Sequence, residues 1–95
     1  MERLQELYEL VQNRQKLRPV NSYTTELFEV GKPRIAQKVG EEAVEVVVAS
    51  LAGKPEEIIS ETADLMYHLT VLMVESGITW EQVLSELDSR QNGTK

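Results

Sequence analysis

A chain of 95 residues with 41% hydrophobic content suffices for one small domain with a modest core, and dimerisation would cover further apolar surface. The formal net charge of −6 argues against nonspecific nucleic-acid binding, which needs a basic surface. There is no cysteine for a disulfide or thiolate metal site, and no apolar run approaches the roughly 20 residues of a membrane span. We therefore predict a soluble, cytoplasmic protein that binds neither nucleic acid nor membranes.

Apolar spacing, prolines and glycines predict four helices in the first part of the chain, over residues 2–16, 23–30, 33–52 and 55–76. The first ends in the loop around Pro19, because the residue before a proline is biased away from helix. Ser22 is the expected N-cap of the second. Each of the two long helices has a proline in its first turn and a glycine directly after its end, as is typical of helix boundaries.

The last helix has the clearest start signal in the sequence. Thr79 and Gln82 have the spacing of a capping box, and Ile78 with Val83 can form the hydrophobic staple around it. On this helix we expect three residues to face the core: Val83, Leu84 and Leu87.

No segment reads as a pair of strands with turn chemistry, so the predicted fold class is all-α. We predict a five-helix chain whose two long central helices form a helical bundle, completed by a homodimer. Residues 1–90 make a single domain, and residues 91–95 form a polar, frayed tail.

Acidic residues cluster on both long helices, as Glu41-Glu42-x-x-Glu45 and Glu61-x-x-Asp64. Residues three or four apart share a helix face, where like charges cost about 0.2–0.5 kcal/mol per pair. Both clusters border apolar stripes, where carboxylates are costly unless a cation pairs with them. Antiparallel packing would bring the two clusters together. Because Mg²⁺ prefers oxygen ligands, the pattern predicts a magnesium site between the helices.

Other readings of these residues stay open. Glu-x-x-Glu and Glu-x-x-Asp also occur on solvated helix faces. Arg34 and Lys38 either pair with the glutamates one turn away or hold phosphate groups. A di-iron site needs two Glu-x-x-His motifs, and the one histidine, His68, excludes it within a single chain. His68 is better read as a supporting or packed polar residue than as a ligand.

Three segments make a resemblance specific: SYT at 22–24, GKPRIAQKVGEEAVE at 31–45 and ETADLMYH at 61–68. They closely resemble the phosphoribosyl-ATP pyrophosphohydrolase family, the histidine-biosynthesis member of the all-α NTP pyrophosphatase (MazG-like) superfamily. The superfamily pattern EExxE…ExxD is complete, with a gap of fifteen residues. The likeness covers about residues 3–90, and the first two segments narrow it to this family.

The resemblance implies a phosphoribosyl-ATP diphosphatase, which hydrolyses phosphoribosyl-ATP to phosphoribosyl-AMP and pyrophosphate with Mg²⁺. It implies four metal ligands: Glu42, Glu45, Glu61 and Asp64. It implies two catalytic glutamates, Glu41 and Glu45, the former orienting or activating water. It implies five substrate-binding residues: Ser22, Tyr23, Thr24, Arg34 and Lys38. A homodimer with active sites near its interface follows as well, with a phosphoribosyl-AMP cyclohydrolase as a further candidate partner.

Two rival functions remain at this point. A house-cleaning nucleoside triphosphate pyrophosphatase of the same superfamily would use the same metal site with a different base pocket. A non-catalytic dimeric helical bundle would carry the acids only as surface solvation, and would not respond to Mg²⁺.

Overall fold

The computed structural model describes residues 2–91, which form five α-helices with no strand among them. The helices are α1 (Glu2–Leu17), α2 (Tyr23–Val30), α3 (Lys32–Ala52), α4 (Pro55–Ser76) and α5 (Trp80–Ser89). The predicted all-α class and helix order are confirmed. Of the predicted tail, residues 92–95 lie outside the described part of the chain. None of the described helices is long and apolar enough to cross a membrane.

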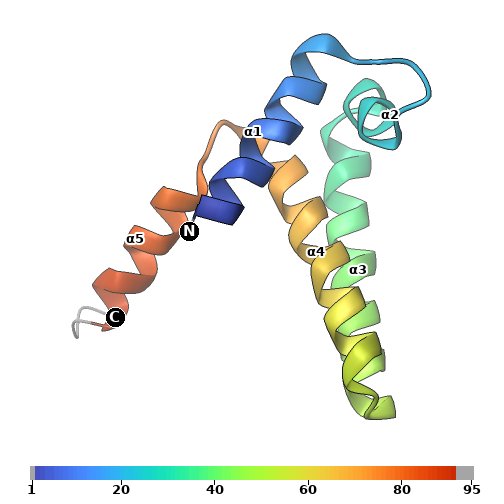
Figure 1. The fold of residues 1–95 in the computed structure, drawn as a ribbon, viewed down its shortest axis with the longest axis vertical. Helices are drawn as coiled ribbons and strands as arrows, with labels where there is room; N and C mark the ends of the chain where they lie inside the picture. Colours follow the sequence, from blue (N-terminus) through green and yellow to red (C-terminus); the bar gives the residue numbers. More distant parts are fainter. Residues whose placement is uncertain (1, 92–95) are drawn as a thin grey trace.

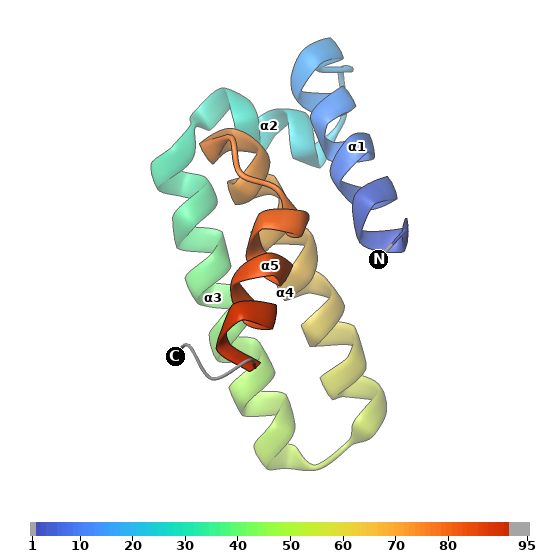
Figure 2. The same ribbon diagram turned by 90° about the vertical axis from the view of Figure 1, so that its left-hand side faces the viewer.

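The two long helices α3 and α4 form an antiparallel hairpin, with more contacts between them than between any other pair of helices (Figure 1). At the upper end of the hairpin, α1 packs on α4, and α2 bridges α1 and α3. The helix α5 points away from the hairpin and touches α1 (Figures 1 and 2). Its Trp80 side chain also donates a hydrogen bond to the Thr70 hydroxyl of α4 at 3.1 Å. The opposite end of the hairpin therefore projects alone.

Local signals in the sequence fix where the helices begin and end. The Ser22 side chain accepts a hydrogen bond from the Thr25 backbone N–H at 3.2 Å, which confirms it as the N-cap of α2. Thr79 and Gln82 make both hydrogen bonds of the predicted capping box. Gly53 and Gly77 end α3 and α4 with φ of +80° and +74°, a left-handed conformation that favours glycine.

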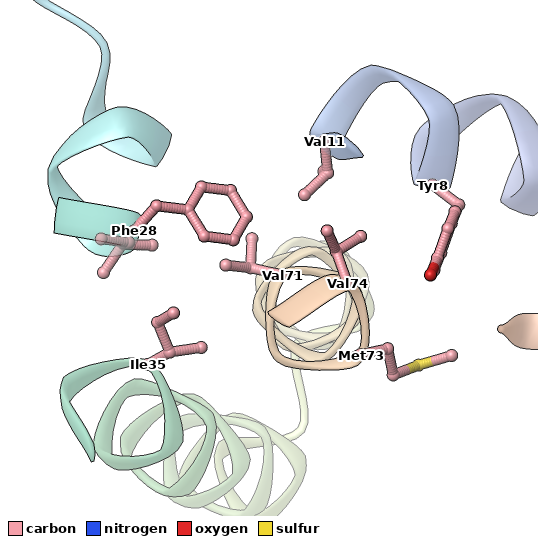
Figure 3. Close-up of a cluster of buried hydrophobic side chains, with 8 residues drawn as sticks. Tyr8, Val11, Phe28, Ile35, Val71, Met73 and Val74 are labelled. Atoms are coloured by element: carbon pink, nitrogen blue, oxygen red, sulfur yellow. The ribbon is translucent and has the colours of Figure 1, made fainter. Parts of the chain in front are cut away.

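The hydrophobic core lies where α1, α2 and α4 meet the beginning of α3 (Figure 3). Its fully buried apolar members are Val11, Ile35 and Val71, one each from α1, α3 and α4. The remaining members of the buried cluster are Tyr8, Leu27, Phe28, Met73 and Val74. Trp80 and Val83 of α5 pack against the edge of this cluster.

The expectation that Leu87 faces the core is wrong, since this residue is 48% exposed. The reason is the direction of α5, which diverges from the hairpin so that only its first turns reach the core. The projecting end of the hairpin likewise exposes large apolar side chains. They are Val44, Val47, Val48, Leu51 and Ile59.

We predict that Ile35→Ala lowers the free energy of unfolding by about 2–5 kcal/mol, because it leaves a cavity between α3, α2 and α4. Leu17→Ala is the matched control on an exposed side chain, and a change within about 0.5 kcal/mol is expected. Urea denaturation at one protein concentration measures both. Equal effects of the two variants would contradict the position of the core.

Candidate active site

Three carboxylates converge between the two long helices. One carboxylate oxygen each from Glu42 on α3 and from Glu61 and Asp64 on α4 lie within 4.8 Å of one another. Glu42 and Glu61 are partly buried, whereas Asp64 is exposed. The antiparallel packing of α3 and α4 thus brings together acids that are 19 to 22 positions apart in the sequence.

Electrostatic repulsion in this group is visible at Glu61. Its pKa is raised above the ordinary value, first because partial burial removes the carboxylate from water, and then because the negative charges of Glu45, Asp64 and Glu42 repel its own. Glu45 is exposed and outside the closest group of three, yet it is the strongest of these repelling charges. An all-oxygen site of mutually repelling carboxylates fits a divalent cation such as Mg²⁺.

Cationic side chains flank the acids on α3. The Lys38 Nζ lies 3.2 Å from Glu42 Oε2 and 3.6 Å from Glu41 Oε1. Its hydrogen bond to Glu42 raises the pKa of Lys38, and the nearby Tyr23 phenol contributes to the same shift. Arg34 Nη1 lies 3.8 Å from Glu41 Oε2, so both cations are ion-paired on the helix.

Glu41 belongs to this cationic group rather than to the three converging carboxylates. Besides Arg34 and Lys38, it accepts a hydrogen bond from Gln37 Nε2 at 3.0 Å. Its side chain lies on the exposed side of α3, one turn before Glu45. The two predicted catalytic glutamates therefore have different surroundings.

The segment Ser22–Thr24 is fastened to α4 just beyond Asp64. Tyr23 Oη lies 2.8 Å from His68 Nε2, and the Thr24 hydroxyl is hydrogen-bonded to the Tyr67 hydroxyl. Tyr23 is 48% exposed and can face a ligand, but Thr24 is only 2% exposed and its hydroxyl is turned inward. Ser22 is occupied in capping α2. The structure thus leaves Tyr23 as the member of this segment with an accessible side chain.

Comparison with known proteins agrees with the acidic pattern and the fold. The sequence model of the family described as phosphoribosyl-ATP pyrophosphohydrolase matches residues 4–91. The chain belongs to the phosphoribosyl-ATP pyrophosphohydrolase family. A phosphoribosyl-ATP pyrophosphatase of Saccharolobus solfataricus is 52% identical over 86 residues, covering 90% of this chain and 92% of the relative.

Two other relatives extend the comparison. A phosphoribosyl-ATP pyrophosphatase of Saccharolobus islandicus is 49% identical over 85 residues, with 90% of each chain covered. The histidine biosynthesis bifunctional protein HisIE of Thermotoga maritima is 50% identical over 86 residues. That match covers 90% of this chain but 44% of the bifunctional protein.

The sequence predicts no contact for Tyr67 and only a supporting role for His68. In the structure, both residues anchor the Ser22–Thr24 segment to α4. The signal available was spacing: His68 follows Asp64 by one helical turn and shares its face of α4. The partners on α2 are more than 40 positions away, so the pairing itself depends on tertiary structure.

We predict that Glu61→Gln removes the response of the protein to Mg²⁺ without lowering its metal-free stability. Loss of a repelled charge should leave the metal-free melting temperature equal or higher. At a Mg²⁺ concentration 100 times its Kd, the wild type should gain about 2.7 kcal/mol, and the variant much less. Thermal melts with Mg²⁺ and with chelator measure both.

The matched control is Glu56→Gln, which removes the same charge from the exposed first turn of α4. It should keep the full Mg²⁺ response. A wild type indifferent to Mg²⁺, or a Glu61→Gln variant that gains as much as the control, would contradict a metal site at this cluster.

Proposed function

We propose that this chain hydrolyses phosphoribosyl-ATP to phosphoribosyl-AMP and pyrophosphate, a step of histidine biosynthesis. The observation that carries the proposal is the convergence of the Glu42, Glu61 and Asp64 carboxylates in a chain of this family. The names of three relatives, which are 49–52% identical over 90% of this chain, support the substrate and the pathway. A cytoplasmic location stays a prediction.

Four carboxylates are proposed as the metal ligands: Glu42, Glu45, Glu61 and Asp64. The choice of Mg²⁺ rests on their hard oxygen donors and on its use with phosphate substrates. Bound there, Mg²⁺ would lower the pKa of water and neutralise charge on the phosphates. With water as the nucleophile, the site needs only to position the reactants and to accept one proton.

The chain's own residues divide this work. Lys38 and Arg34 are proposed to exchange their glutamate partners for phosphate oxygens. As the water oxygen bonds to the α-phosphorus, the bond between this phosphorus and the α–β bridging oxygen breaks, and pyrophosphate leaves. Glu45 is proposed to accept the water proton, because its charge acts at the carboxylate cluster, whereas Glu41 lies beside the cations. Glu41 would hold the Arg34 and Lys38 side chains in place until the substrate binds.

Pyrophosphate release from phosphoribosyl-ATP, measured with Mg²⁺ and with chelator, tests this function. We expect Mg²⁺-dependent release that falls at least about 100-fold in Glu61→Gln, equivalent to about 2.7 kcal/mol of transition-state stabilisation. Glu56→Gln should retain activity. Hydrolysis of other nucleoside triphosphates in preference to phosphoribosyl-ATP would favour the house-cleaning alternative, and inactivity on every nucleotide would favour the interaction module.

We also propose a homodimer formed through the projecting end of the α3–α4 hairpin. This end exposes Val44, Val47, Val48, Leu51 and Ile59, which no other described helix covers. Val44, Val47, Val48 and Leu51 share one face of α3 by their helical spacing, and an exposed apolar face is typical of an interface. The acidic cluster lies on the same hairpin, so a second copy would sit close to the site.

The relative named a bifunctional histidine biosynthesis protein supports a second activity acting beside this one. A phosphoribosyl-AMP cyclohydrolase, which would consume the proposed product, stays our prediction for that partner.

Leu51→Lys is predicted to convert the dimer to a monomer of 10.8 kDa, because it places a charge in the proposed interface. Leu17→Lys is the control, since it makes the same change on an apolar residue that is also near a helix C-terminus. Leu51 is 84% exposed and Leu17 is 71% exposed, so neither substitution should unfold the chain. Sedimentation equilibrium measures the mass. A monomeric wild type, or a dimeric Leu51→Lys variant, would contradict this interface.

A further inference from the structure

Two hydrogen bonds between side chains clasp the first turn of α2 to α4. Tyr23 Oη lies 2.8 Å from His68 Nε2, and the Thr24 and Tyr67 hydroxyls bond to each other. The Tyr23 and His68 rings also meet edge to face, with centroids 5.6 Å apart and an interplanar angle of 74°. His68 is buried, so this contact is shielded from water on the imidazole side.

The hydrogen bond made by the other ring nitrogen of His68 determines which of the two nitrogens carries the proton. Nδ1 is 2.7 Å from the backbone carbonyl oxygen of Asp64. A carbonyl oxygen can only accept a hydrogen bond, so Nδ1 must carry the proton. In the neutral form of His68, which has a single N–H, Nε2 is therefore an acceptor, and Tyr23 is the donor in their bond.

This direction limits what Tyr23 can offer to a ligand. A phenol has one O–H, and in Tyr23 it is directed to His68. Any further hydrogen bond of the Tyr23 oxygen must then use its lone pairs. Phosphate oxygens are acceptors too, so Tyr23 is not suited to binding them. It is suited to a hydrogen-bond donor of the substrate.

We propose that His68 is a positioning residue that holds Tyr23 as a hydrogen-bond acceptor for a hydroxyl of the nucleotide ribose. This rests on the proposed function, in which Arg34 and Lys38 hold the phosphates. Tyr23 lies near Lys38, and the ribose is the part of a nucleotide joined directly to its phosphates. The carboxylates and cations thus bind the charged groups, and the clasp selects the sugar.

Nitrogen-15 NMR tests the proton position without any assay of activity. His68 is the one histidine of the chain, so the ring signals of the tag-free protein need no assignment. In alkaline buffer we expect a protonated Nδ1 and an unprotonated Nε2. Tyr23→Phe should shift the Nε2 signal. A protonated Nε2 would overturn the proposal even if the enzyme hydrolyses phosphoribosyl-ATP.

Two substitutions of the histidine separate its two bonds. In His68→Gln the side-chain amide can reach the position of Nε2 and accept from Tyr23. In His68→Asn the shorter amide can serve only the Asp64 carbonyl. We expect kcat/KM to fall about tenfold in Tyr23→Phe and in His68→Asn, the size of one lost hydrogen bond. The double variant should be no worse than either one, and His68→Gln should recover most of the activity.

Analogues that lack the 2′- or the 3′-hydroxyl of the adenosine ribose identify the group bound. The wild type should discriminate against one of them, and Tyr23→Phe and His68→Asn should lose that discrimination. Tyr67→Phe is the control, because it breaks the other bond of the clasp between the same two helices. It should lower stability but keep the discrimination. A wild type that accepts both analogues equally, or a His68→Asn variant that behaves as Tyr67→Phe does, would overturn the proposal.

Discussion

The hydrophobic core holds α3 and α4 together against repulsion among the carboxylates in the middle of the hairpin. Glu42, Glu61 and Asp64 approach one another despite their charges because the core fixes both helices. On α3, Glu42 lies seven residues after buried Ile35, and on α4, Asp64 lies seven residues before buried Val71. Seven residues are two helical turns, so each acid shares a face with a core residue. Burial of the apolar pair therefore imposes the convergence of the acids.

Much of this was accessible from the sequence because the signals are local. Ser22, Thr79 and the glycines after α3 and α4 set the helix bounds through hydrogen bonds and dihedral angles of neighbouring residues. The acidic convergence followed from helical period and antiparallel packing. The exposure of Leu87 did not follow, because it depends on the direction in which α5 leaves the core. Periodicity identifies an apolar face, but it does not say which element covers it.

Side-chain partners within the site were the least predictable part. Glu41 and Glu45 have similar positions in the motif, yet one is drawn to Arg34 and Lys38 and the other adds to the negative field at Glu61. The two residues share a face of α3, so the difference arises from their positions along the helix. Glu41 lies close to Arg34 and Lys38, whereas Glu45 lies one turn further on, where its charge acts on Glu61. The hydroxyl of Thr24 could not be placed from the sequence either, since tertiary packing buries it and directs it to Tyr67. A motif gives the residue types of a site, whereas packing decides which of their atoms are free.

Packing also decides which groups of the site can select the substrate. An acidic cluster with flanking cations recognises only metal and phosphate, so it would serve any triphosphate equally well. Selectivity within such a superfamily has to come from groups that contact the uncharged parts of the nucleotide. In this chain the accessible member of the Ser22–Thr24 segment is Tyr23, whose one donor is directed to His68. Because His68 is fixed in turn by the Asp64 carbonyl, α4 both orients the proposed sugar contact and supplies two of the proposed metal ligands, Glu61 and Asp64.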